Sequence, residues 1–123
     1  VSERVYQPTI VDEPSPQATL STSEVFGPVT SIYGFDTVEQ AIDRANSLPT
    51  MFQSAAFTRD LDRAMYIANN LLASAVMIND HTAFRVDWMA FAGRGVSGYG
   101  VGGIGHTMSE MVEEKLTVIK RST

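Results

Sequence analysis

Glycine is concentrated in one stretch of the chain, and its spacing there could serve phosphate chemistry. Seven of the nine glycines lie between Phe91 and Gly105, where the pattern G-x-G-x-x-G occurs three times, starting at Gly93, Gly98 and Gly100. This spacing exposes backbone N–H groups to a pyrophosphate when the glycines join a strand directly to a helix. Glycine also serves tight turns and close backbone approach without any ligand.

The place of these glycines in the chain favours the second role. The predicted strand before them ends near Asn79, fourteen residues before Gly93, so no strand leads directly into the loop. No Gly-Lys-Ser or Gly-Lys-Thr occurs, which excludes a P-loop. We therefore expect residues 93–105 to form a coil that packs against a site built mostly elsewhere and binds no phosphate through its own amides.

Strand and helix patterns alternate before the glycines. Val29–Phe35, Ser54–Thr58 and Ala75–Asn79 are short runs rich in apolar, β-branched or aromatic residues, which indicates strands. A helical pattern follows each of the first two. Such alternation with short links predicts βαβ crossovers, a parallel sheet and an α/β fold.

The two predicted helices have capping signals and apolar stripes. Asp36 with Glu39 predicts a capping box for the first helix, which Pro49 ends, and Asp60 predicts the cap of the second. The stripes consist of Val38, Ala41, Ile42 and Ala45, and of Leu61, Ala64, Met65, Ala68, Leu71 and Leu72.

The two ends of the chain are organised differently. Residues 1–23 indicate turns, apart from a short extended stretch at 5–11. A helix from about Thr107 to Glu114 and a strand at Leu116–Lys120 are expected to close the chain. That strand has apolar groups on both faces, so it would be an exposed, adhesive edge if it stayed unpaired.

Composition limits the classes of function. The chain has 123 residues, 44% of them hydrophobic, which suits one globular domain. Its net charge of −5 disfavours nucleic acid or an anionic membrane as a partner, and no apolar run reaches the length of a membrane span. The absence of cysteine excludes a disulfide scaffold, a thiolate metal site and a thiol nucleophile within this chain. We expect a cytoplasmic protein and no metal site, with His106 an exposed residue at a helix start.

Several motifs together resemble the aldehyde dehydrogenase superfamily, in the right order and over nearly the whole chain. EVFGPV at 24–29 is similar to that family's E-[IV]-F-G-P-V motif. MAFAGRGVSGYG at 89–100 is similar to its M-P-F-G-G-x-K-x-S-G-x-G loop. The remaining matches are AAFTRDLDRA at 55–64, VMIND at 76–80 and EEKLTVIK at 113–120.

The resemblance implies a fold, an activity and partners. Residues 1–115 would be the C-terminal part of the catalytic domain, built from parallel-sheet βαβ units, and residues 116–123 an oligomerisation strand and tail. The parent enzyme would oxidise an aldehyde to a carboxylic acid with NAD or NADP, as a homodimer or tetramer. Its catalytic Cys and general-base Glu would lie upstream, so we expect this chain alone to be inactive. The start at Val1 hints at a fragment.

The same resemblance assigns cofactor contacts to Glu24 and Phe26. The carboxylate of Glu24 would accept hydrogen bonds from the nicotinamide ribose hydroxyls, for which a two-oxygen acceptor is suited. The ring of Phe26 would pack beside the nicotinamide. The residues alone also allow a helix-terminal Glu and a core Phe.

Four residues are candidates for substrate binding. Phe91 matches the aromatic residue that walls the family's substrate tunnel, with a buried loop aromatic as the alternative. Asn79 matches an Asn that supports loop geometry near the active site, although a strand-ending turn residue is the other interpretation. His81 and Arg85 lie in a loop that would face the aldehyde entrance. The Arg85 guanidinium would suit an anionic aldehyde, or it could form a structural ion pair with Asp80 or Asp87.

The loop also departs from the family pattern. Ala90 replaces the usual Pro, Ala92 the first Gly of the pair, and Gly95 the Lys. The run NDHTAFRVDWM is most similar to a branch that acts on small phosphonate- or phosphate-bearing aldehydes, the phosphonoacetaldehyde dehydrogenase-like branch. The alternative to the enzyme is a stand-alone small α/β binding or regulatory domain.

Overall fold

The computed structural model describes residues 4–121, and the chain divides into two compact units, Val1–Leu48 and Pro49–Thr123. The outermost residues of the two predicted domains, 1–3 and 122–123, lie outside the described part. The elements are β1 (Thr9–Asp12), α1 (Thr19–Thr22), β2 (Val29–Ile32), α2 (Val38–Asn46), β3 (Thr50–Met51), β4 (Gln53–Ala56), α3 (Leu61–Asn70), β5 (Ala75–Ile78), β6 (Arg94–Gly95) and α4 (Ile104–Glu110).

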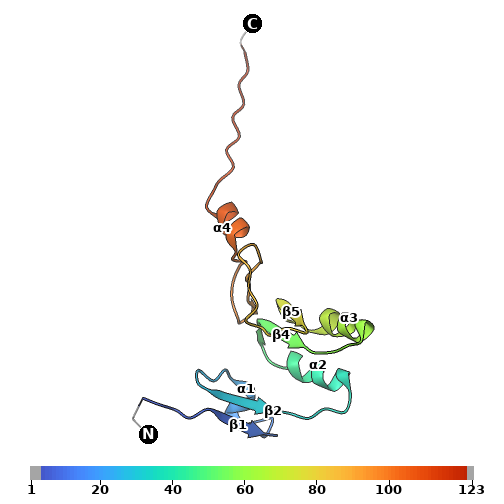
Figure 1. Cartoon of the computed structure of the whole chain (residues 1–123). Helices are drawn as coiled ribbons and strands as arrows, with labels where there is room; N and C mark the ends of the chain where they lie inside the picture. Colours follow the sequence, from blue (N-terminus) through green and yellow to red (C-terminus); the bar gives the residue numbers. More distant parts are fainter. Residues whose placement is uncertain (1–3, 122–123) are drawn as a thin grey trace. The chain divides into compact units, whose positions relative to one another are not determined.

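The first unit is built on a parallel pair of strands. β1 pairs with β2 in a register that runs from Thr9 opposite Val29 to Asp12 opposite Ile32, and Figure 1 shows the two strands side by side. The prediction for residues 1–23 was therefore incomplete, because it contained neither β1 as a paired strand nor the short helix α1. β1 is only four residues long, and its partner lies about twenty residues further along the chain.

Helix α2 begins one residue later than its predicted cap. The cap is Thr37, whose hydroxyl accepts a hydrogen bond from the Gln40 N–H at 3.3 Å. The predicted cap, Asp36, instead donates its own N–H to the Gln40 side chain at 2.9 Å. The capping-box prediction with Glu39 was wrong because Thr37 and Gln40 form the same kind of pattern, shifted by one position. Ile42 on this helix is buried.

A stack of polar and aromatic groups joins the elements of the first unit. The guanidinium carbon of Arg44, near the end of α2, lies 4.0 Å from the ring centre of Tyr33. The Tyr33 hydroxyl donates to the Ser21 hydroxyl of α1 at 2.6 Å, and Ser21 donates to the Ser15 carbonyl at 2.7 Å. A cation over an aromatic face is favourable, so this stack helps to hold α1, β2 and α2 together.

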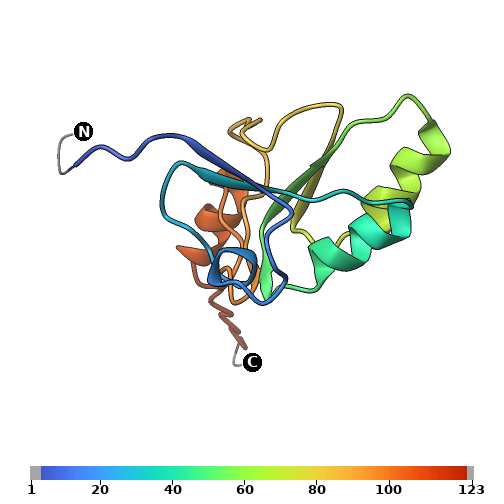
Figure 2. The same cartoon turned by 90° about the horizontal axis from the view of Figure 1, so that it is seen from below.

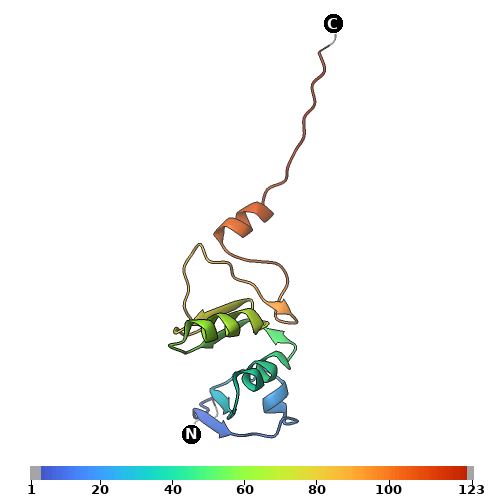
Figure 3. The same cartoon turned by 90° about the vertical axis from the view of Figure 1, so that its right-hand side faces the viewer.

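The second unit contains the predicted strand–helix–strand repeat. β4 and β5 are parallel, with Gln53 opposite Ala75 and Ala56 opposite Ile78, and α3 lies beside them (Figures 1 and 3). The predicted cap of α3 is confirmed, since the Asp60 carboxylate accepts the Arg63 N–H at 2.9 Å. The α/β fold class with parallel strand pairs is therefore confirmed.

The core of this unit is small. Ala64 and Met77 are its buried apolar side chains within the described residues. Half of the predicted stripe of α3 is exposed, namely Leu61, Met65 and Leu72, and Leu61 at its start is 75% exposed. The apolar surface of the helix is thus larger than residues 4–121 can cover.

The glycine-rich segment is mostly coil, as predicted, and winds between the strands and α4 (Figures 2 and 3). It includes the two-residue strand β6, which pairs antiparallel with β3 and was not predicted. The last helix begins at Ile104, three residues before its predicted start, because the Gly103 carbonyl already accepts the Thr107 N–H at 2.8 Å. It ends at Glu110, where Met111 closes a tightened last turn.

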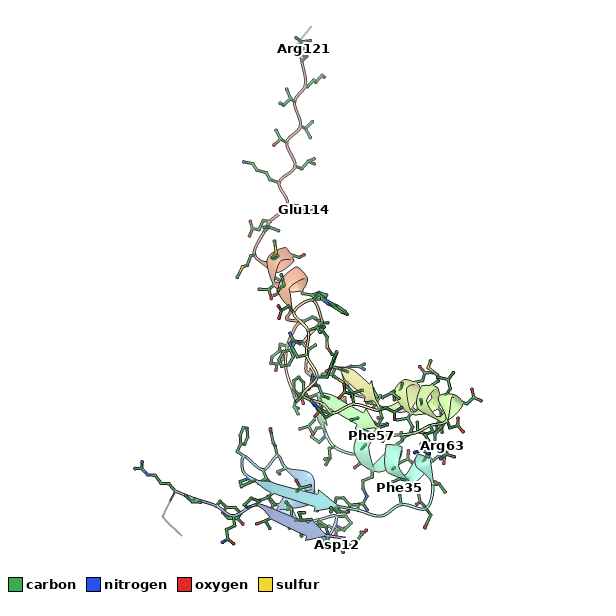
Figure 4. The ribbon with its side chains drawn as sticks, viewed as in Figure 1. Asp12, Phe35, Phe57, Arg63, Glu114 and Arg121 are labelled. Carbon is green, nitrogen blue, oxygen red and sulfur yellow. The ribbon has the colours of Figure 1, made fainter. Side chains whose placement is uncertain are left out.

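The segment after α4 has no strand partner among the described residues. Figure 4 shows the side chains between Glu114 and Arg121 on alternate sides of an extended backbone. The side chains of Leu116, Val118 and Ile119 are exposed. The oligomerisation strand stays a prediction, since its hydrogen bonds would have to come from another chain. The described helices are all too short, or too polar, to cross a membrane.

Candidate functional site

The turn at residues 23–28, here called the Glu24 turn, connects α1 to β2 and presents the two predicted cofactor residues. Two short-range hydrogen bonds shape it, from the Gly27 N–H to the Val25 carbonyl at 2.9 Å and from the Val29 N–H to the Gly27 carbonyl at 2.8 Å. Phe26 is 94% exposed, so it is not a core residue of the first unit. The Glu24 carboxylate is exposed and makes no hydrogen bond or ion pair within residues 4–121.

The loop at residues 79–91, here called the Arg85 loop, starts with a fixed change of chain direction. Asn79 follows β5 directly and has a φ of 59°, in the left-handed region that Asn tolerates better than most residues. Its N–H donates to the Ala56 carbonyl at 2.8 Å, and its Oδ1 accepts the Thr58 N–H at 2.8 Å. Asn79 therefore joins the end of β5 to the segment that follows β4. This arrangement is compatible with a residue that supports loop geometry near an active site and with a residue that ends a strand in a turn.

His81 folds the first turn of the loop. Its N–H donates to the Asp80 carboxylate at 2.8 Å, and its Nδ1 accepts the Ala83 N–H at 3.1 Å. The imidazole Nε2 lies 3.9 Å from the same carboxylate. A ring that accepts at Nδ1 has its proton on Nε2 when neutral. With Nδ1 bonded to the Ala83 N–H, Nε2 is the ring atom that faces the Asp80 carboxylate.

Arg85 and Phe91 are brought together by the return of the loop. The guanidinium carbon of Arg85 lies 4.4 Å from the ring centre of Phe91, within the range of a cation–π contact. Within residues 4–121 Arg85 forms no ion pair, with Asp80, Asp87 or any other acidic residue. The structural ion pair considered from the sequence is therefore absent there, and the edges of the guanidinium stay available for hydrogen bonds.

The other neighbour of Phe91 is Phe52, from the link between β3 and β4. The two ring centres are 5.1 Å apart and the rings are nearly perpendicular, at 88°. The backbone of Phe91 is fixed as well, since it exchanges two hydrogen bonds with Gly102, at 2.9 and 2.7 Å. Phe91 is therefore held by its ring and by its main chain.

Close backbone packing explains the glycine at the start of the glycine-rich segment. A Cβ placed on Gly93 would lie 2.2 Å from the Ser97 carbonyl oxygen and 2.7 Å from the Gly98 nitrogen. The Ser97 hydroxyl in turn accepts the Met51 N–H of β3 at 2.9 Å. The segment is thus a tightly folded coil pinned to β3, and close approach is the reason for glycine at position 93.

The structure brings together only some of the predicted site residues. Arg85 and Phe91 are in contact, while Asn79 and His81 shape the start of the same loop. Glu24 and Phe26 belong to the other unit. No group of three or more His, Cys, Asp or Glu side chains within residues 4–121 is arranged to hold a metal ion.

Sequence reasoning missed Phe52, Thr58 and Ser74. The Ser74 hydroxyl lies within hydrogen-bond distance of the carbonyls of both Phe52 and Ala92, next to Phe91, and can donate to either. Phe52 stands one residue before β4, and Ser74 one residue before β5. Nothing local to these residues indicates contacts made across 18 or more positions. Thr58 was predicted as the last residue of a strand, and it lies two residues beyond β4.

The sequence profile of the aldehyde dehydrogenase family matches residues 2–117, and the chain belongs to this family. Among its curated relatives is the 3-sulfolactaldehyde dehydrogenase of Priestia aryabhattai, which is 33% identical over 114 residues, 93% of this chain and 24% of the relative. The lactaldehyde dehydrogenase of Methanococcus maripaludis is 42% identical over 100 residues, 81% of this chain and 22% of the relative. The chain thus spans about a quarter of the length of these relatives.

Solved structures give the same family. An indole-3-acetaldehyde dehydrogenase in complex with NAD⁺ superposes with a TM-score of 0.83 at 34% identity, covering 93% of this chain and 23% of that one. The glyceraldehyde-3-phosphate dehydrogenase of Methanocaldococcus jannaschii in complex with NADP has a TM-score of 0.80 at 37% identity, covering 87% and 23%. The fold of this chain is therefore that of the corresponding quarter of these enzymes.

Proposed function

We propose that this chain is part of an NAD(P)-dependent aldehyde dehydrogenase, in which it contributes cofactor contacts and one wall of the aldehyde pocket. The proposed reaction converts an aldehyde and water to a carboxylate and reduces the cofactor. The observation that carries the substrate side is the Arg85 guanidinium, which rests on Phe91 without an ion pair in the described residues.

The Glu24 turn fits the predicted contact with a nicotinamide cofactor. The free carboxylate of Glu24 can accept two hydroxyl donors, and the exposed ring of Phe26 offers an apolar face. When bound, the cofactor supplies the acceptor for hydride. The role of these two residues is to hold and orient it. Relatives solved with NAD⁺ and with NADP support this proposal without choosing between the two cofactors.

An anionic aldehyde is the substrate class that suits Arg85. A guanidinium grips phosphonate, phosphate or sulfonate oxygens through paired N–H groups. Two relatives are named for aldehydes that carry such a group, 3-sulfolactaldehyde and glyceraldehyde 3-phosphate. Because the relatives also include a lactaldehyde dehydrogenase, family membership alone does not select the anion. The Arg85 guanidinium is the feature that favours the anion.

The substitution Arg85→Ala in the full-length enzyme tests this proposal. Loss of a charged, paired hydrogen bond should raise the KM for phosphonoacetaldehyde by about ten- to hundredfold and leave the KM for propanal nearly unchanged. Arg63→Ala, which removes the same charge from the exposed face of α3 (Figure 4), is the matched control and should change neither value. Equal effects of Arg85→Ala on both aldehydes would show that Arg85 is structural.

Three further parts of the proposal concern the whole protein. We expect the thiol nucleophile to come from outside these 123 residues, which hold no cysteine, so that the chain alone is inactive. The enzyme should be a cytoplasmic homo-oligomer, a dimer or tetramer, in which Leu116–Lys120 gains a strand partner. A stand-alone binding or regulatory domain would instead show no gain of aldehyde oxidation when the natural gene containing this sequence is expressed in full.

A further inference from the structure

Phe52 has no predicted role, yet its contacts lead directly to the candidate anion-binding group. Its ring meets Phe91 at 5.1 Å and 88°, and Phe91 carries the Arg85 guanidinium at 4.4 Å. The order of contacts is therefore Phe52, Phe91, Arg85. A nearly perpendicular contact between two rings depends on the rotation of each, because turning either ring breaks the edge-to-face fit.

The backbone places Phe52 and Phe91 in fixed register. The Phe52 carbonyl accepts the Ser74 N–H at 2.8 Å, and the Ser74 hydroxyl contacts both this carbonyl and that of Ala92. Ala92 follows Phe91 in the chain, so Ser74 joins the two segments that carry the rings. Two main-chain hydrogen bonds to Gly102 fix Phe91 from the other direction.

Arg85 itself has little else to hold it. It lies in an exposed loop, and within residues 4–121 its guanidinium contacts the Phe91 ring and makes no hydrogen bond or ion pair. A long charged side chain on a loop loses considerable rotamer freedom when it binds a ligand. An aromatic ring already in contact with the guanidinium reduces that loss, because part of the side chain is placed before the anion binds.

We propose that Phe52 is a positioning residue that sets selectivity for anionic aldehydes by fixing the Phe91 ring on which Arg85 rests. The inference rests on the proposed function, because it names how Arg85 is held. Phe52 acts through Phe91 and Arg85 and needs no contact of its own with the substrate.

The test is a double-mutant cycle in the full-length enzyme, with the KM ratio of phosphonoacetaldehyde to propanal as the readout. Phe52→Leu, with Phe52→Met as a second variant of similar volume, should raise this ratio about three- to tenfold. The inhibition constant of methylphosphonate against propanal oxidation should rise by the same factor. Phe52→Tyr keeps the ring and should restore the wild-type ratio. Phe57→Leu, a change of the same type just beyond β4 (Figure 4), is the control and should leave the ratio unchanged.

The cycle with Arg85→Ala decides the mechanism. If Phe52 acts through Arg85, adding Phe52→Leu to Arg85→Ala should raise the ratio no further. An additive effect, or a Phe52→Leu enzyme with the wild-type ratio, would overturn the positioning role while leaving the proposed function intact. If Arg85→Ala itself leaves the ratio unchanged, the anionic-substrate proposal fails first and this inference fails with it.

Discussion

The two units of the chain close their parallel strand pairs in the same way. In the first, Glu13 follows β1 with a φ of 45°, donates its N–H to the Ile32 carbonyl at 2.9 Å, and accepts the Gly34 N–H on its carboxylate. In the second, Asn79 follows β5 and makes the corresponding pair of bonds to Ala56 and Thr58. Each of these two residues directly follows a strand and has a positive φ. In each case the side chain accepts the N–H of the residue that lies two positions beyond the end of the paired strand.

What the two units present to a ligand is very different. In the second unit the loop that follows Asn79 returns to the protein, where Arg85 and Phe91 are already in contact. In the first unit the Glu24 turn makes no such contact, and Phe26 is 94% exposed. The two units therefore end their strands in the same way, but this does not determine whether the nearby ligand-binding residues are already in contact. The Arg85 loop is largely organised within this chain, and the Glu24 turn is not.

The largest expected effect comes from a substitution in the glycine-rich segment of the second unit. Gly93→Ala would force a Cβ to within 2.2 Å of the Ser97 carbonyl oxygen, so the main chain must move. We expect a loss of about 3 kcal/mol or more in stability, seen as a lower Tm and soluble yield of the full-length enzyme. Gly105→Ala is the matched control. It lies in α4 with nothing within 4 Å of the added carbon, so it should be neutral or stabilising by about 0.5–1 kcal/mol. Similar melting temperatures for the two variants would contradict the tight packing.

The next largest expected effect comes from a substitution in the exposed Glu24 turn of the first unit. Glu24→Gln should slow hydride transfer by roughly tenfold or more, because a charged hydrogen-bond acceptor for the ribose is lost. Its Tm should not change, since the carboxylate has no partner in the described residues. The measurement is pre-steady-state formation of reduced cofactor. Asp43→Asn, an equivalent neutralisation on α2, should leave the rate intact. An unchanged rate in Glu24→Gln would remove the cofactor assignment.

The smallest effect compares the two strand ends directly. Asn79→Ala loses both the hydrogen-bond acceptor and the tolerance of Asn for positive φ, so we expect a loss of about 1–2 kcal/mol. Glu13→Ala loses only the acceptor at an exposed position, and its cost should be about 1 kcal/mol or less. Chemical denaturation of the full-length enzyme gives both values, with Asn79→Asp as the conservative control. A larger cost for Glu13→Ala would reverse the comparison.

Local signals in the sequence were enough for much of the fold. The Asp60 cap and the strands on either side of α3 follow from side-chain chemistry and periodicity within a few residues. The cap of α2 was misplaced because Asp36 and Thr37 are both good N-caps and only the backbone decides between them. β1 was not predicted as a paired strand, since two apolar residues in four give little pattern and its partner is distant in the sequence.

The candidate site was predictable to a smaller extent. Glu24, Phe26 and Phe91 were selected through motifs similar to those of a known family and stay predictions, and the structure adds how Phe91 is held. For Arg85 the sequence left two roles open, a structural ion pair and the binding of an anionic ligand. The choice depends on where the side chain lies, and the spacing of residues in the sequence does not determine that. Phe52 and Ser74 contact residues that are distant in the sequence, and for this reason no local pattern could have indicated them.

The pair of hydrogen bonds between Phe91 and Gly102 also bears on how this segment can change during evolution. It closes the intervening residues into a ring, in which Tyr99, three residues before Gly102, is fully exposed. Lengthening a closed loop is cheap, since doubling its length costs only about 0.6 kcal/mol in closure entropy. An insertion beside Tyr99 lies outside the close contact between Gly93 and Ser97, so we expect it to leave the Phe91–Gly102 hydrogen bonds in place, which makes this position suitable for an attached label.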